Sequence, residues 1–492
     1  MLLLVTFDTI ISWQIINSLM LYINGRMGMI ERFFKLKENK TNVKTEVLAG
    51  ITTFMTMAYI LAVNPNTMTA FNDILGLEGS ARMNPNGVFL ATAIASCLAT
   101  LLMAFCANYP FALAPGMGLN AYFAYTVVLK MGYSWQFALA AVFVEGLIFV
   151  LLSLTNVREA IFNSIPATLK LAVSAGIGLF IAFIGLQNGG IVESNSATMV
   201  QFHAFHGDTV TQTQNVSVIL AIIGVIITAI LLIKNVKGGI LLGILATWIL
   251  GIICQLTGLY VIDPAAGFFS LLPDFSKGLQ LSALGDVAFK LDFTKMFSLD
   301  FLIVVFAFLF VDVFDTLGTL IGVASKSNML DKDGKLPRIK GALIADAVGT
   351  TAGAALGTST VTTFVESATG VSEGGRTGLT AFVVAVLFGL SVFLSPIFLA
   401  IPGFATAPAL IIVGFYMISS ILKIDFEDMA EAIPAFICII AMPFTYSISE
   451  GISFGVISYV VINLITGKAK DKKISIVMYI LAVLFILKYI FM

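Results

Sequence analysis

The chain has 492 residues, of which 59% are hydrophobic and only 11% are charged, and its formal net charge at pH 7 is −1. This composition excludes an ordinary soluble globular protein, and the near-zero charge gives no sign of a nucleic-acid partner. Runs of about 20 apolar residues recur along the whole chain, and each can cross a bilayer as a helix. We therefore predict an all-α polytopic membrane protein in contact with membrane lipid.

The N-terminal segment, residues 1–45, has two parts. Residues 1–23 are mostly apolar, and they lack the basic start and the small-residue cleavage site of a signal peptide. From Met29 the chain reads MIERFFKLKENK, which is typical of a basic cytoplasmic tail. Residues 1–28 are therefore either an extra helix or a wrongly assigned start, and we favour the second interpretation.

The apolar runs after this segment define the expected membrane spans. They are 46–66, 86–107, 115–130, 134–155, 166–187, 216–234, 237–257, 299–322, 340–356, 358–372, 377–398, 404–423, 432–447, 449–467 and 473–491. Lys and Arg lie mostly in the loops on one side of these spans. The positive-inside rule then puts residues 26–45 in the cytoplasm of a multi-pass protein of the cell (plasma) membrane. The 188–215 loop falls outside, and we expect its two histidines, His203 and His206, to be solvated.

Two stretches interrupt the apolar pattern at membrane depth. One reads NYPFALAPGMGLN (108–120), and the other, from about residue 349, reads GTTAGAALGTSTVTT. They lie about half the chain apart, and Pro166 and Pro402 open helices at similar distances after them. Matching interrupted segments in two halves indicate an inverted-repeat transporter. We expect a first repeat at 46–257, an extracellular connection at 258–298, a second repeat at 299–467 and a C-terminal hydrophobic appendage at 468–492.

The run VDVFDTLGT places Asp312 and Asp315 on one face of an expected membrane helix. Charged groups at membrane depth are costly, so such a pair indicates a functional site. Asn120 follows the first interruption and Glu366 the second. Asn120, Asp312 and Glu366 could together surround a small planar molecule with N–H donors and a carbonyl or ring nitrogen.

Small residues near the interruptions, among them Thr358 and Ser359, would let a flat ligand approach the free N–H groups of a half-helix. The alternative is that they only allow close helix packing. Phe306, Phe308, Phe310 and Phe314 could stack on a ligand, although packing or lipid contact is the favoured interpretation.

Three further ionisable residues lie in or beside the expected spans. Asp346 and Arg376 could pair with each other. For Glu145, a structural role and a functional role remain equally open.

Four stretches together resemble the AzgA-like purine permeases, the adenine/guanine/hypoxanthine branch of the nucleobase transporters. They are GITTFMTMAYILAVNP, ALAPGMGLNAYFAYTVV, VDVFDTLGTLIGVA and GTSTVTTFVESATGVSEGGRTGLTA. The resemblance covers about residues 29–492. It implies fourteen transmembrane segments in two inverted repeats of seven, with a core and a gate domain and short strands in the broken segments three and ten. The last span, 473–491, would be one more than the fourteen.

The resemblance also implies that Asn120, Asp312 and Glu366 contact the purine and that Asp315 is a second essential acid. The expected function is proton-coupled uptake of guanine/hypoxanthine or adenine by alternating access, with the proton on the Asp312/Asp315/Glu366 cluster. Such a protein is not an enzyme, and we expect neither cofactor nor metal. A transporter of the same fold for uracil, xanthine or another small solute, a channel and a membrane enzyme remain as alternatives. The family suggests a homodimer.

Overall fold

The computed structural model describes residues 28, 30–155, 165–207, 210–263, 267–276, 280–326, 329, 336–472 and 474–491. Residues 1–27, for which we expected either an extra helix or a wrongly assigned start, therefore lie outside the described residues. Ten of the described helices are long and apolar enough to cross a membrane by length and composition.

The first half of the chain, together with the central connection, contains sixteen of the described elements. They are α2 (Val43–Met57), α3 (Ile60–Met68), α4 (Phe71–Ile74), η1 (Gly79–Ala81), α5 (Pro85–Leu102), η2 (Met103–Ala107), β1 (Leu113–Pro115), α6 (Met117–Ala121), η3 (Tyr122–Lys130), α7 (Trp135–Leu154), α9 (Ala167–Asn188), β2 (Val192–Asn195), β3 (Met199–Phe202), α10 (Gln212–Ile233), α11 (Gly239–Leu256) and η5 (Leu281–Asp286).

The second half repeats this order of long and interrupted elements. They are α12 (Leu299–Lys326), α13 (Ile339–Leu356), β4 (Val361–Thr363), α14 (Ser367–Ser372), α15 (Gly378–Ser391), η6 (Val392–Leu394), α16 (Ser395–Leu399), α17 (Gly403–Ile418), η7 (Ser419–Lys423), α18 (Met429–Thr445), α19 (Ile448–Ile465) and α20 (Ile476–Phe491). Pro166 and Pro402 are the N-caps of α9 and α17, as predicted. A proline suits a helix start because its missing N–H would have no partner there.

The contacts between the long helices divide them into two groups. One group joins α2, α5, α7, α12, α13 and α15, and the other joins α9, α10, α11, α17, α18 and α19. Contacts between the groups include α12 against α9 and α19, α2 against α11, α6 against α9, and α3 against α17. This arrangement confirms the expected core and gate.

Two short strands from the interrupted segments pair inside the core group. β1 and β4 run antiparallel, with Leu113 opposite Thr363, Ala114 opposite Thr362 and Pro115 opposite Val361. All six residues are buried. Backbone groups in a membrane need partners inside the protein, so two extended segments at this depth satisfy each other. The short strands that the family resemblance implied are confirmed.

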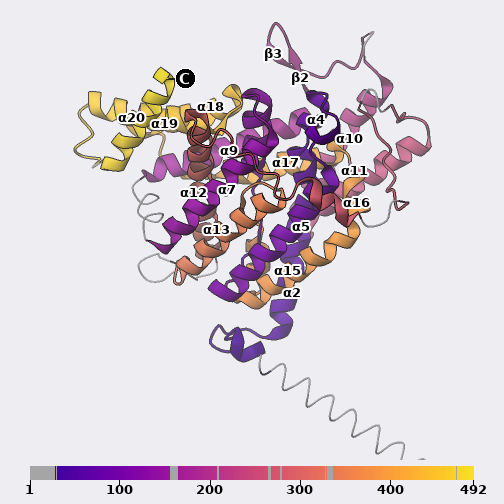
Figure 1. Ribbon diagram of the computed structural model, residues 1–492, viewed down its shortest axis with the longest axis horizontal. Coiled ribbons are helices and arrows are strands. Elements are labelled where there is room, and N and C mark those ends of the chain that lie inside the picture. The colour runs from indigo at the N-terminus through magenta and orange to yellow at the C-terminus, as the bar shows by residue number, and fades with distance from the viewer. Residues whose placement is uncertain are drawn as a thin grey trace, which may run out of the picture.

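A second hairpin, β2–β3, projects from the top of the molecule in Figure 1, in the loop between α9 and α10. It carries His203, whose side chain is buried rather than solvated as expected. Nδ1 lies 2.5 Å from Glu193 Oε1, and Nε2 lies 2.7 Å from Asn215 Oδ1. The expectation for His203 was wrong because an external loop was taken to leave its side chains in solvent, whereas this one packs against Asn215 of α10.

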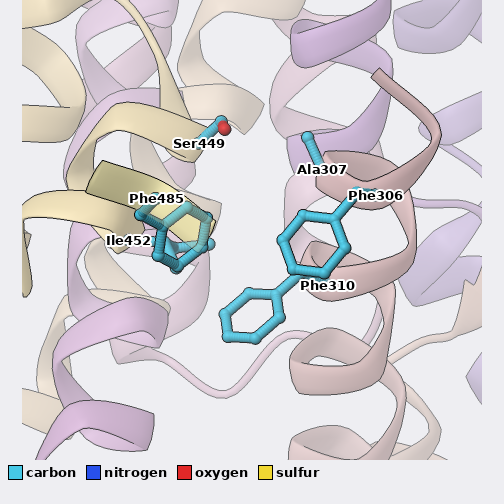
Figure 2. A pocket seen from close by; sticks show the side chains of 6 residues that line it. All are labelled: Phe306, Ala307, Phe310, Ser449, Ile452 and Phe485. Atoms are coloured by element: carbon cyan, nitrogen blue, oxygen red, sulfur yellow. The ribbon is translucent and has the colours of Figure 1, made fainter. Parts of the chain in front are cut away.

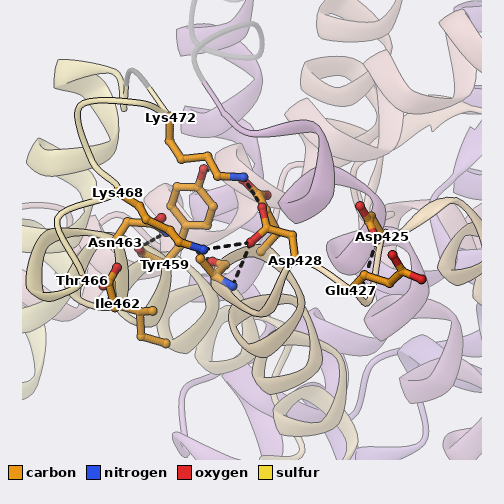
Figure 3. A network of polar contacts seen from close by, with 11 residues as sticks. Asp425, Glu427, Asp428, Tyr459, Ile462, Asn463, Thr466, Lys468 and Lys472 are labelled. Atoms are coloured by element: carbon orange, nitrogen blue, oxygen red, sulfur yellow. Dashed lines mark hydrogen bonds and ion pairs between the residues drawn. The ribbon is translucent and has the colours of Figure 1, made fainter.

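The predicted appendage is helix α20, which packs on α19. Figure 3 shows the polar network before it, in which Lys472 donates to Asp428 and also lies 3.1 Å from Glu431 Oε1. The hydrogen bond from Lys472 holds the pKa of the Asp428 carboxyl below its usual range. These contacts attach the start of α20 to the start of α18, in the gate group.

Candidate functional site

The first interruption brings the backbone very close to its neighbours at Gly116. A Cβ atom there would lie 2.7 Å from Thr362 Cγ2 and 3.2 Å from Asp315 Oδ2, which leaves no room for a side chain. The Gly116 N–H donates to the Thr360 carbonyl at 3.0 Å. The glycine therefore lets β1, β4 and the Asp315 carboxylate converge.

The second interruption begins where Gly357, at φ +102°, ends helix α13. A side chain at this φ would be strained, so glycine suits the position. Asn64 of α3 donates to the Thr358 hydroxyl at 2.9 Å, and Thr350 of α13 donates to the Val361 carbonyl at 2.9 Å. Side chains from two helices thus fix the segment that leads into β4.

Asp312 belongs to a buried cluster centred on the hydroxyl of Thr316. Thr316 Oγ1 lies 2.8 Å from Asp312 Oδ1, 2.8 Å from Asp346 Oδ1 and 2.8 Å from Thr362 Oγ1. All four side chains are buried, and they come from α12, α13 and β4. The cluster places two carboxyl groups on one shared hydroxyl.

Glu366 lies three residues after the end of β4, as the N-cap of α14, and it is partly exposed. The buried Tyr59 hydroxyl, at the junction of α2 and α3, donates to Glu366 Oε1 at 2.7 Å. A hydrogen bond to a charged acceptor is among the stronger ones in proteins. Sequence reasoning missed Tyr59, because one Tyr in an apolar helix carries no signal of its own.

The predicted residues Asn120 and Ser359 present buried oxygen atoms, Asn120 Oδ1 and Ser359 Oγ, that have no hydrogen-bond partner in the part of the chain that the structure describes. Asn120 lies in α6, and its Nδ2 donates to the Pro115 carbonyl at 3.4 Å. Buried polar atoms normally have partners, so each open oxygen suits a contact from a ligand or a water molecule. The Thr358 hydroxyl, in contrast, is engaged by Asn64.

The expected pair of Asp346 and Arg376 is not formed between these described residues. The Arg376 guanidinium donates to the carbonyls of Val371 and Gly375, while the Asp346 carboxyl contacts the Thr316 hydroxyl. The prediction was wrong because the sequence does not report which helix faces meet. Glu145 accepts a 3.1 Å hydrogen bond from Thr360, directly before β4.

The aromatic residues of α12 pack within the protein. The rings of Phe308 and Tyr122 pack edge to face, with their centroids 4.9 Å apart. Figure 2 shows a small apolar pocket in which Phe306 and Phe310 face Phe485 of α20. The side chain of Phe314 lies outside the described residues. These contacts favour the packing interpretation for the described rings.

Comparison with known proteins identifies the family to which the chain belongs. A family model described as "Permease family" matches residues 44–485. The chain belongs to this permease family. Two relatives are the guanine/hypoxanthine permease PbuG of Bacillus subtilis and the adenine permease AdeP of Escherichia coli. PbuG is 44% identical over 94% of this chain and 100% of its own length, and AdeP is 41% identical over 94% of this chain and 96% of its own.

The fold of the permease also recurs in a solved structure of low identity. It resembles the transmembrane domain of a cyanobacterium bicarbonate transporter, BicA, with a TM-score of 0.58 and 15% identity, over 84% of this chain and 97% of that domain. The likeness to BicA gives the permease a 7+7 inverted-repeat fold. The family and its permease relatives make it a multi-pass cell-membrane transport protein and not an enzyme.

Proposed function

We propose that this permease takes up purine nucleobases, guanine/hypoxanthine or adenine, together with protons by alternating access. The base binds between core and gate, where Asn120, Asp312 and Glu366 provide its polar contacts. The open oxygens of Asn120 and Ser359 add acceptors for N–H groups of the base, and Thr358 holds the segment in place. The names of the relatives PbuG and AdeP support the substrate class.

Proton coupling is supported by the number of O–H hydrogens available for the contacts of the Thr316 hydroxyl. Three short contacts meet at this hydroxyl, but Thr316 and Thr362 supply only two O–H hydrogens between them. Whichever threonine donates in the contact between them, the single O–H hydrogen of Thr316 can reach at most one of the two carboxylates. The third contact becomes a hydrogen bond when the other carboxyl carries a proton. We propose that this added proton, exchanged with Asp315 and Glu366, is the coupled one.

Transport of an anion is the second candidate, because the fold resembles a bicarbonate transporter. The residues gathered around β1 and β4 disfavour it, since Asp312, Asp315, Asp346 and Glu366 would repel an anion. Uracil and xanthine remain as substrates of the same fold, and competition of labelled hypoxanthine uptake by a panel of bases separates them.

The test is uptake of labelled hypoxanthine, guanine and adenine by cells or proteoliposomes that contain the permease. We expect concentrative uptake that an inward proton gradient drives and a protonophore abolishes. Glu366→Gln should reduce uptake by at least about tenfold, because a charged acceptor is lost from the site. Uptake of normal size and pH dependence in this variant would refute the role of Glu366, and protonophore-insensitive uptake would refute proton coupling.

A further inference from the structure

Tyr59 lies where the first membrane span changes from α2 to α3. The backbone tightens here, with hydrogen bonds from Leu61 N–H to the Ala58 carbonyl at 3.1 Å and from Ala62 N–H to the Tyr59 carbonyl at 3.0 Å. The side chain is 1% exposed. A buried phenol keeps its place only when its O–H finds a partner, so the direction of the hydroxyl is constrained.

That partner is Glu366 Oε1, at 2.7 Å and 307 residues further along the chain. Tyr59 is buried whereas Glu366 is partly exposed. The phenol therefore lies behind the carboxylate, on the protein side, and engages one of its two oxygen atoms. The second oxygen, Oε2, is not engaged by Tyr59 and can meet another donor.

The two elements that carry this contact are locked together. A Cβ atom on Gly370 of α14 would lie 2.0 Å from Thr53 Oγ1 and 2.6 Å from the Ala49 carbonyl of α2. Thr56 Oγ1 and Thr369 Oγ1 lie 3.0 Å apart. Because α2 and α14 are in such close contact, their backbones have little room to move relative to each other. Tyr59 and Glu366 therefore keep their relative position.

We propose that Tyr59 is a positioning residue for the substrate, whose hydroxyl holds the Glu366 carboxylate with Oε2 directed to the N–H groups of the bound base. This inference rests on the proposed function, since it takes Glu366 as the acceptor of the base. A carboxylate that is already fixed loses little rotamer freedom when the ligand binds, so the affinity is higher. Tyr59 acts through Glu366 and does not need to touch the base.

The test compares Tyr59→Phe with Tyr260→Phe in the full-length permease, with labelled hypoxanthine, guanine and adenine as the probes. Tyr260 is the matched control, because its buried hydroxyl donates to the Phe269 carbonyl at 3.1 Å, away from the β1–β4 pair. We expect Tyr59→Phe to raise KM about tenfold, with Vmax within about twofold, as follows from losing a hydrogen bond to a charged group. Tyr260→Phe should leave KM unchanged.

Suppose that Glu366→Gln is inactive but Tyr59→Phe has a KM within about twofold of the wild type. This result would overturn the role of Tyr59 and leave the proposed function intact. Absence of saturable purine uptake by the wild type would instead overturn the proposed function itself. Failure of Tyr59→Phe to fold, judged by gel filtration in detergent, would also count against the proposal. It would make the hydroxyl a structural group, whereas the phenylalanine ring preserves the packing.

Discussion

At Thr316 a single hydroxyl group meets three oxygen atoms of buried side chains, from Asp312, Asp346 and Thr362. A carboxyl group buried away from solvent depends on such donors for its hydrogen bonds. A buried polar group with no partner lowers the stability of the fold by about 1–3 kcal/mol, and by more when it is charged. Thr316 therefore links α12, α13 and β4 chemically as well as sterically. Its loss would affect both carboxyl groups together.

We predict that Thr316→Val lowers purine uptake at least about tenfold while the protein still folds, because valine has nearly the shape of threonine but lacks the shared donor. The measurement is the rate of labelled hypoxanthine uptake, normalised to the amount of permease in the membrane. Thr228→Val is the control, since the Thr228 hydroxyl bonds only the Gly224 carbonyl of its own helix among the contacts of the described chain. Equal uptake by the two variants would contradict the role of Thr316.

The residues at this scale differ in how visible they were in the sequence. Asp312, Asp315 and Glu366 could be found because a charge at membrane depth is costly. Thr316, Thr362 and Tyr59 could not, since Thr and Tyr are tolerated throughout membrane helices as packing residues. Asp346 was noticed but matched with Arg376, because sequence alone does not report which helix faces meet.

At the scale of elements, the interrupted segments were recognisable from Pro, Gly and small residues, but their pairing was not. A three-residue strand has too few positions for a period of two to be read, and β1 and β4 lie about 250 residues apart. Their strands were expected only through the family resemblance. What fixes α14, the helix after β4, is close contact with α2 at Gly370.

We predict that Gly370→Ala destabilises the permease by about 1–3 kcal/mol and reduces uptake, because the new methyl group overpacks the α2–α14 contact. The added Cβ would meet the Ala49 carbonyl at 2.6 Å, and a backbone atom cannot turn away as a flexible side chain can. The melting temperature in detergent measures the effect. Gly285→Ala is the control, since a Cβ at Gly285 meets nothing within 4 Å. A melting temperature equal to that of the control would refute the close contact.

At the scale of the whole molecule, the gate group carries the β2–β3 hairpin on the side that the charge pattern predicts to be extracellular. His203 fastens this hairpin to α10 through Glu193 and Asn215. Asn215 Nδ2 donates to the Phe205 carbonyl at 3.1 Å, so its Oδ1 is the acceptor that faces His203. Both ring nitrogens then face acceptors, and only the protonated imidazolium donates to both. Burial lowers the pKa of His203, but the hydrogen bonds to Glu193 and Asn215 outweigh it, and the pKa is raised above 6.5.

We predict that this fastening makes the stability of the permease depend on external pH. Since the folded-state pKa of His203 is raised, its contribution is complete below about pH 6.5 and is lost as the pH rises through the folded-state value. The loss should be about 1 kcal/mol, because the Glu193 side chain is 38% exposed and solvent screens the pair. Melting temperatures between pH 5.5 and 9 measure it. His203→Gln should flatten the decline at high pH, whereas His206→Gln, which changes the exposed histidine of the same loop, should retain it. A decline of the same size in both variants would assign the pH dependence to other groups.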